Sequence, residues 1–125
     1  MEQVGDRMRK IKFRAWCEND KEMLRWEDMQ LWGINSLNDG GLMKVMFIEY
    51  TGLKDKNGKE IYDGDIITAH SEYNTIESGI VKWDNKEASF RIEQGISVGT
   101  SFYGFQQIEN IEVIGNIYEN PELIK

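Results

Sequence analysis

The chain has 125 residues, 15 of them basic and 22 acidic, which gives a net charge of −7, and it is 40% hydrophobic and 30% charged. This length predicts one small domain, or one domain with an appendage, and the composition is that of a folded protein rather than a disordered one. An acidic protein repels phosphate backbones over most of its surface, so the charge disfavours general nucleic-acid binding.

The sequence lacks the marks of membrane-spanning and secreted proteins. No apolar run approaches the roughly 18 residues needed to cross a bilayer, and "MEQVGDRMRK" has no apolar core of a secretory signal. The single cysteine, Cys17, cannot form an intrachain disulfide and suits a reducing compartment. We therefore expect a cytoplasmic protein with no membrane partner.

Residues 11–26 predict a β-hairpin. In "IKFRAWC" Cys17 falls on the apolar face, while Lys12, Arg14 and Trp16 share the other face, as in a half-buried strand. "ENDK" supplies turn chemistry, and "MLRW" alternates again. Residues 27–43 carry a weak signal, which favours a loop after a short helical turn, and "KVMFIEY" indicates a further strand.

The stretch 50–67, "YTGLKDKNGKEIYDGDII", combines a glycine–lysine pair with two turn signals. A phosphate loop needs four residues between its glycines and then Lys-Ser/Thr; here five intervene, and Glu60 takes the hydroxyl position. An EF-hand loop starting at Asp55 fails because Lys59 and Glu60 occupy the positions of an oxygen ligand and the required glycine. The stretch therefore predicts two turns, Asn57–Gly58 surrounded by solvated charges and Asp63–Gly64–Asp65 leading into a strand.

Four later segments read as strands: "DIITAH", "SGIVKWD", "SFRIEQ" and "IEVIGNIYE". "WDNKEAS" predicts a hairpin turn between two of them, and Gly115 indicates a bulge or a close backbone approach. Short strands at regular spacing with little helical period favour a small barrel or sandwich, so the fold class is mainly β.

Two groups of side chains are candidates for an interaction surface. Lys and Arg make up five of the eight residues in "RMRKIKFR", and Trp16 shares a strand face with two of them, which favours an exposed or interface position for this tryptophan. "SFYGF" places three aromatic residues in an expected loop, whereas Trp83 shares a face with Val81 and is expected in the core. The candidate residues are Arg9, Lys10, Lys12, Arg14, Trp16, Phe102, Tyr103 and Phe105.

No catalytic motif is present in the sequence. Nucleophilic catalysis needs a base beside a nucleophile, yet Cys17 falls on an apolar strand face and His70, the single histidine, ends a strand before a polar loop. An Asp63–Asp65 pair could hold a divalent ion, but such Asp-Gly pairs are more often plain turns. We expect a protein that is not an enzyme and that has no catalytic residues, cofactor or metal.

Four blocks of the sequence, "IKFRAW", "YTGLKDKNGKEIYDGDII", "GIVKWD" and "IEVIGNIYENPEL", resemble the YopX family of phage and prophage proteins. The resemblance runs from about Met8 to Lys125, so residues 1–7 precede the usual start and are expected to be disordered. It implies an N-terminal β-rich extension containing a hairpin, over residues 1–49, and a partly open SH3-like barrel over residues 50–125. It implies no activity.

Two functions remain open at this point. The first is a non-enzymatic phage accessory protein that associates with protein, either with itself as a homo-oligomer or with a host or phage partner. The second is a nucleic-acid-binding module that uses the N-terminal basic and aromatic face. An enzyme using Asp63, Asp65 and His70 with a metal ranks third.

Overall fold

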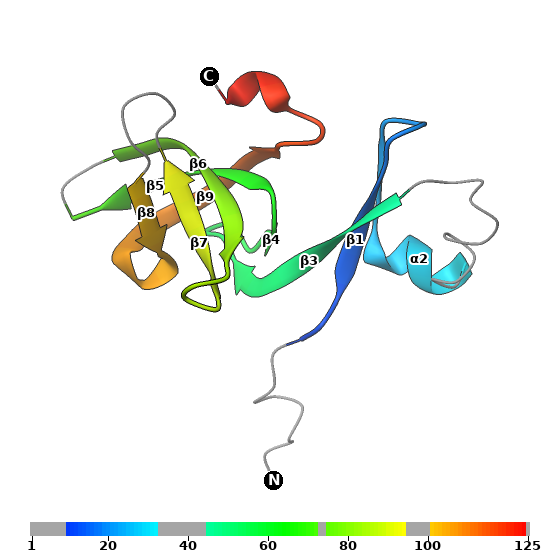
Figure 1. The fold of residues 1–125 in the computed structure, drawn as a ribbon, viewed down its shortest axis with the longest axis horizontal. Coiled ribbons are helices and arrows are strands. Elements are labelled where there is room, and N and C mark those ends of the chain that lie inside the picture. Colours follow the sequence, from blue (N-terminus) through cyan, green and yellow to red (C-terminus); the bar gives the residue numbers. More distant parts are fainter. Residues whose placement is uncertain (1–9, 33–44, 73–74, 95–100, 125) are drawn as a thin grey trace, which may run out of the picture. The chain divides into compact units, whose positions relative to one another are not determined.

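The structure is a computed structural model that describes residues 10–32, 45–72, 75–94 and 101–124, with backbone only for residues 30–32 and 101–102. Residues 1–7 and most of the weakly patterned segment 27–43 lie outside this description. The contacts divide the chain into two compact units, Met1–Gly52 and Leu53–Lys125. This boundary and the one expected from the sequence, between residues 49 and 50, both fall within a single strand, β3 (Figure 1). The chain is mainly β, as predicted.

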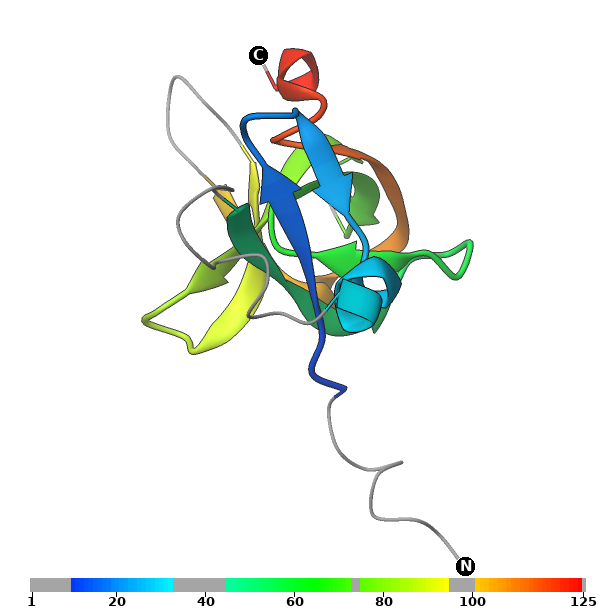
Figure 2. The same ribbon diagram turned by 90° about the vertical axis from the view of Figure 1, so that its right-hand side faces the viewer.

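The N-terminal unit contains a small antiparallel sheet with one helix against it (Figure 2). The predicted hairpin is confirmed, because β1 pairs with β2 through Ala15↔Leu24, and β1 pairs with β3 on its other side. The buried side chain of Met29 on the helix packs on Ala15 and Leu24. The elements are β1 (Phe13–Cys17), β2 (Glu22–Leu24), α2 (Trp26–Trp32) and β3 (Val45–Lys54).

The face of the first strand that was expected to contact solvent is largely buried. The predictions for Trp16 and for Lys12, which directly precedes β1, are therefore wrong. Trp16 is 5% exposed and Lys12 is 6% exposed. The Lys12 ammonium lies 5.2 Å from the centroid of the Tyr50 ring, so its aliphatic stem is buried while its charge faces an aromatic surface. The Trp16 indole N–H donates to Glu18 Oε2 at 2.8 Å. The alternation of side chains predicted exposure for this face. That prediction failed because a long side chain with a polar end can bury its apolar part against a neighbouring residue.

The C-terminal unit is a five-stranded antiparallel sheet, in the order β8-β7-β6-β5-β9, that curls into a half-barrel (Figure 1). Its core includes Ile67, Val81 and Ile92, all fully buried. Strand β4 adjoins β3 in the other sheet, order β2-β1-β3-β4. The elements are β4 (Glu60–Tyr62), β5 (Asp65–Ser71), β6 (Thr75–Asp84), β7 (Ser89–Gln94), β8 (Ser101–Gly104), η2 (Phe105–Gln107), β9 (Ile108–Asn116) and η3 (Pro121–Leu123).

Both predicted turns are present. Gly58 and Gly64 have φ of 85° and 86°, the left-handed backbone that these turns require. The expectation of solvated charges around the first turn is wrong for Asp55, which is 7% exposed and accepts the N–H groups of Asn57 and Lys59 with one carboxylate oxygen. Asp65 is also buried and accepts the Tyr62 N–H at 2.8 Å. The two carboxylates therefore shape the turns.

Gly115 lies both at a bulge and at a close approach of the backbone, the two features that the sequence indicated for it. The β5–β9 register runs from Ile66↔Gly115 to Ile67↔Val113, so one residue, Ile114, bulges out of β9. A Cβ on Gly115 would lie 2.6 Å from the side chain of Asn120, because the chain folds back closely after β9. The glycine thus allows η3 to approach the strand.

Candidate functional site

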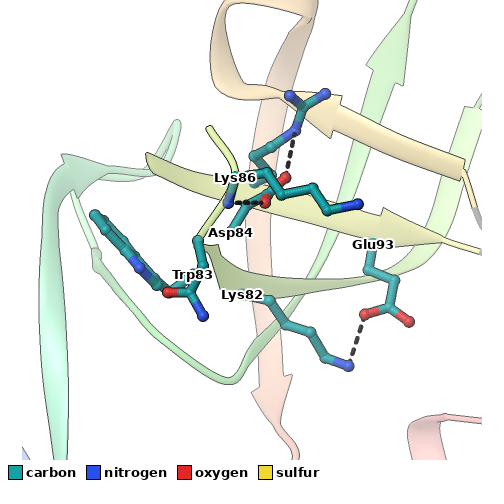
Figure 3. Close-up of a pocket in the computed structure, with 7 residues that line it drawn as sticks. Lys82, Trp83, Asp84, Lys86 and Glu93 are labelled. Atoms are coloured by element: carbon teal, nitrogen blue, oxygen red, sulfur yellow. Dashed lines mark hydrogen bonds and ion pairs between the residues drawn. The ribbon is translucent and has the colours of Figure 1, made fainter. Parts of the chain in front are cut away.

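The site with the clearest surface features is the hairpin between β6 and β7. A shallow hollow of about 540 Å³ lies here and combines three cations, two carboxylates, one amide and one indole (Figure 3). It lies at the end of the half-barrel where β6 turns into β7 (Figure 1). The lining residues are Lys82, Trp83, Asp84, Asn85, Lys86, Arg91 and Glu93.

The local sequence builds this hairpin through one carboxylate. Asp84 Oδ1 accepts the backbone N–H of Lys86 at 2.9 Å and that of Glu87 at 3.4 Å, so the side chain replaces a backbone acceptor in the turn. Ala88 closes the turn with φ of 52°. The pairing then starts at Asp84↔Ser89 and continues through Trp83↔Phe90. The turn predicted from "WDNKEAS" is confirmed.

Trp83 is 44% exposed, so the expectation that it lies in the core is wrong. Its ring contacts that of Phe90 edge to face, with the centroids 5.1 Å apart and the planes at 75°. Phe90 is buried and belongs to the core, whereas Trp83 lies one residue from the end of β6, where the core stops. Trp83 does share a strand face with Val81, as predicted. However, β6 ends before another part of the core covers the indole.

The charged side chains of the hollow lie on the other side of the strands. Lys82 and Asp84 alternate with Trp83 along β6, and Figure 3 shows the indole projecting away from Lys82 and Glu93. The Lys82 ammonium is 2.6 Å from Glu93 Oε2. Arg91 Nε is 3.9 Å from Asp84 Oδ2, which is an ion pair without a hydrogen bond.

Lys86 has a different position from the other two cations. It lies at the hairpin tip and is exposed, and among the described residues its ammonium has no ion-pair partner. Exposed Glu87 follows Lys86 directly, so the hairpin as a whole carries three basic and three acidic side chains. The hairpin thus offers an aromatic surface on one face and donors of charged hydrogen bonds on the other, which is the chemistry of binding.

The described residues that were proposed from the N-terminal segment do not form one exposed surface. Lys10 is exposed and Arg14 is half-buried, while Lys12 and Trp16 are buried as described above. Arg9 lies outside the described residues. A second, smaller hollow is lined by Trp16, Glu18, Val45 and Met46.

The segment "SFYGF" forms strand β8 and the start of η2, so the expected loop is wrong. Tyr103 and Phe105 are half-buried and pack against the core of the half-barrel. The side chain of Phe102 lies outside the described residues. Sequence reasoning missed this strand because its aromatic residues had been assigned to a surface.

The residues considered for a metal are not brought together. Asp65 begins β5 and His70 lies near its other end. Asp65 is engaged with the Tyr62 N–H, and His70 Nδ1 lies 3.4 Å from the hydroxyl of Thr75. Within the part of the chain that the structure describes, no three His, Cys, Asp or Glu side chains could hold a metal ion. Cys17 is a buried free thiol.

The hairpin site could have been found from the sequence by one signal. "KWDNK" places a tryptophan directly beside a tight turn, between two lysines. A strand residue next to a turn lies at the end of a sheet, where the core is thin and a large ring remains partly exposed. Strand-face alternation alone does not carry this information.

These features define a class of protein: a small mainly-β protein with a curled half-barrel and an aromatic, charged hairpin at one end. The chain belongs to the YopX family, whose description is "YopX protein" and which it matches over residues 12–125. The crystal structure of protein EF1440 from Enterococcus faecalis is similar, with a TM-score of 0.61 and 26% identity, over 94% of this chain and 100% of that one. No curated protein matches the chain. Among the described helices, none is long and apolar enough to span a bilayer.

Proposed function

We propose that this chain is a non-enzymatic accessory protein of phages or prophages that acts in the cytoplasm by associating with protein through the β6–β7 hairpin of an SH3-like barrel. The observation that carries the proposal is the exposure of Trp83 beside a charged hollow. Tryptophan and arginine are among the side chains most enriched where association energy concentrates, and both occur here. The proposal moves the interaction surface away from Trp16, which is buried, and from Tyr103 and Phe105, which pack on the core.

The edges of the half-barrel favour recognition by side chains over the addition of a strand. On β9, the Val113 N–H is bound by Asp55 and the Ile111 carbonyl by the Lys56 N–H at 2.8 Å. On β8, the Gly104 N–H donates to Gln107 Oε1 at 2.6 Å. An extended peptide that joined either edge would have to displace these bonds.

Nucleic-acid binding through the N-terminal basic face receives less support. Lys12 and Trp16, two of the residues it would use, are buried. A titration of the chain with single- and double-stranded DNA and RNA at low ionic strength tests it, because phosphate contacts make affinity fall steeply with salt. Salt-sensitive binding that was lost in Lys10→Glu would replace our proposal.

The proposal is tested by comparing the proteins captured by the purified chain with those captured by variants. We expect Trp83→Ala and Lys86→Ala to lose partners that the wild type and Lys10→Ala retain; Lys10 is an exposed lysine outside the hairpin. Circular dichroism confirms that each variant is folded. If both hairpin variants recover the wild-type set of proteins, the hairpin is not the association surface.

A further inference from the structure

We propose that Asn57 is a site of spontaneous modification, at which the side-chain amide is lost and isoaspartate forms when the turn over residues 55–59 opens. The site lies in the C-terminal unit, outside the β6–β7 hairpin, so it is independent of the proposed function. It rests on a chemically labile pair of residues in a turn that hydrogen bonds hold closed.

The Asn57–Gly58 pair is the only Asn–Gly step in the sequence. Asparagine is thermolabile in proteins, because the backbone nitrogen of the next residue can attack its side-chain carbonyl carbon, Cγ. Glycine shields that nitrogen least, since it has no Cβ and permits the widest range of backbone angles. The other described asparagines precede bulkier residues or proline, whose nitrogen has no hydrogen. Asn57 is therefore the most reactive of the described asparagines once its backbone is free.

The reaction needs only water. The Gly58 nitrogen forms a bond to Asn57 Cγ, the bond between Cγ and Nδ2 breaks, and the proton of the Gly58 nitrogen leaves with Nδ2 as ammonia. A cyclic imide remains. Water then adds to one of the imide carbonyl carbons. Addition at Cγ gives aspartate, whereas addition at the main-chain carbon of Asn57 gives isoaspartate, in which the chain continues through Cγ.

The surroundings of the pair leave room for this reaction. Asn57 and Gly58 are both exposed, and a Cβ placed on Gly58 would meet no atom within 4 Å. Within the part of the chain that the structure describes, the side-chain amide of Asn57 has no hydrogen-bond partner. Neither the cyclic imide nor the attacking water would therefore be obstructed.

The closed turn restrains the attacking nitrogen. The Gly58 N–H donates to the Asp55 carbonyl at 3.0 Å, which defines a β-turn over residues 55–58. Asp55 Oδ1 also accepts the N–H groups of Asn57 and Lys59, at 2.8 and 2.9 Å. The reaction removes the proton of the Gly58 nitrogen, so the hydrogen bond to the Asp55 carbonyl must first be broken. The turn must therefore open before the pair can react.

The turn is also attached to β9, which makes its opening costly. The Lys56 N–H donates to the Ile111 carbonyl at 2.8 Å, and the Lys56 ammonium lies 3.3 Å from Glu112 Oε1. Asp55 Oδ2 accepts the Val113 N–H at 2.9 Å. Opening of the turn therefore disrupts contacts with the last strand as well as bonds within the turn. The folded protein reacts only through the small fraction of molecules in which the turn is open.

Isoaspartate at position 57 disfavours reclosure of the turn. It adds a methylene group to the main chain, which displaces the N–H groups of Gly58 and Lys59 from the oxygens of Asp55. It also introduces a carboxylate near that of Asp55, which is buried, and like charges close together repel. Each modified molecule therefore has a weaker attachment between the turn and β9, and modified molecules accumulate with time.

The test follows the modification by peptide mapping with mass spectrometry while the purified full chain is incubated at neutral pH, either folded or unfolded in urea. Loss of the amide changes the mass of the peptide that contains Asn57, and enzymatic methylation identifies isoaspartate. In the unfolded chain we expect Asn57 to react before the other asparagines, because it alone precedes glycine. In the folded chain it should react at least about tenfold more slowly, since only open turns react.

A variant tests whether Asp55 controls the rate. Asp55→Asn weakens the bonds that hold the turn, so Asn57 should react several times faster than in the folded wild type. Glu77→Gln, at an exposed acid on β6, is the matched control and should react at the wild-type rate. Circular dichroism shows whether each variant is folded. If Asp55→Asn does not fold, the comparison of folded and unfolded wild type still decides.

A second variant separates the new charge from the longer main chain. Asn57→Asp introduces the carboxylate without the extra methylene group. Urea unfolding should therefore show a smaller loss of stability for Asn57→Asp than for wild-type protein in which isoaspartate has formed.

Equal rates in the folded and unfolded chains would overturn the inference, since the turn would then give no restraint. An unfolded chain in which another asparagine reacts first would also overturn it. So would isoaspartate-containing protein that unfolds at the same urea concentration as unmodified protein. A folded Asp55→Asn chain that reacts at the wild-type rate would show that the Asp55 contacts do not keep the turn closed, which contradicts the inference as well.

Discussion

Asp55 Oδ2 accepts the backbone N–H of Val113 at 2.9 Å, across 58 residues of sequence. The other oxygen of the same carboxylate holds the Asn57–Gly58 turn through two further N–H groups. One side chain therefore closes a local turn and fastens it to the edge of β9. This long-range bond joins the beginning of the C-terminal unit to its last strand.

Replacing this carboxylate should destabilise the fold. We expect Asp55→Asn to lower the free energy of unfolding by about 2–4 kcal/mol, because the amide has one acceptor oxygen for three N–H donors and carries no charge. Urea unfolding followed by circular dichroism measures the loss. The control is Glu77→Gln, an exposed acid on β6, which should change stability by less than about 0.5 kcal/mol. Equal effects of the two variants would contradict the role assigned to Asp55.

The same carboxylate makes stability depend on pH. Burial alone raises the pKa of Asp55, but the N–H donors of Val113, Lys59 and Asn57, together with the charge of Lys59, outweigh it, so the pKa lies below its usual value. A lowered folded-state pKa stabilises the native state above the unfolded pKa, near ~3.9, and this contribution is lost as the pH falls through the folded value. The stability difference between wild type and Asp55→Asn should therefore be constant from about pH 7 to 5 and shrink below about pH 4. A difference that stayed constant under strongly acidic conditions would contradict the assignment.

Gly79 occupies a position where no side chain fits. A Cβ there would lie 2.4 Å from Ile92 Cγ2 and 2.9 Å from Ile76 Cγ2, and both isoleucines are fully buried. Gly79→Ala should cost about 1–3 kcal/mol in unfolding experiments, since the core must shift to admit one methyl group.

A glycine with open surroundings provides the comparison for this substitution. Gly58 has φ of 85°, and a Cβ placed on it would meet no atom within 4 Å. Gly58→Asn should therefore cost less than Gly79→Ala, because asparagine tolerates this backbone and meets no neighbour. The reverse order would mean that the β6 core is looser than the distances indicate.

Trp83 and Phe90 should differ in their contribution to stability although their rings touch. Phe90→Ala removes a buried core ring and should cost about 3–5 kcal/mol. Trp83→Ala removes a half-exposed ring and should cost about 1–2 kcal/mol. The double variant, measured in a thermodynamic cycle, should show a coupling of about 0.5–1.5 kcal/mol from the edge-to-face contact. Equal single costs would place Trp83 in the core, as the sequence pattern suggested.

Periodicity was sufficient to predict most of the strands, because a two-residue alternation is visible wherever one face is buried. "SFRIEQ" shows this well: Phe90 and Ile92 are buried, while Ser89 is exposed. The turns at Gly58 and Gly64 were equally predictable, since their left-handed backbone restricts the residues that fit.

The candidate site was not predictable in the same way, because exposure depends on which elements cover a strand. For this reason Trp16, which was expected to be exposed, is buried, and Trp83, which was expected in the core, is exposed. β1 and β6 both have a strand on each side, but Trp16 lies within the buried part of β1, whereas Trp83 lies one residue from the end of β6. Asp55 was missed because its partner, Val113, is contributed by a segment far along the chain. The residues around Asp55 in the sequence give no signal for such a long-range contact.

The occupied edges of the half-barrel have a consequence for selectivity. A bare sheet edge accepts almost any extended chain, since the backbone is the same in every protein. Along the described parts of β8 and β9, backbone groups of Gly104, Ile111 and Val113 are already engaged. A chain that approached these edges would therefore be recognised through its side chains, so two proteins with this fold could have different specificities that differ by only a few surface substitutions.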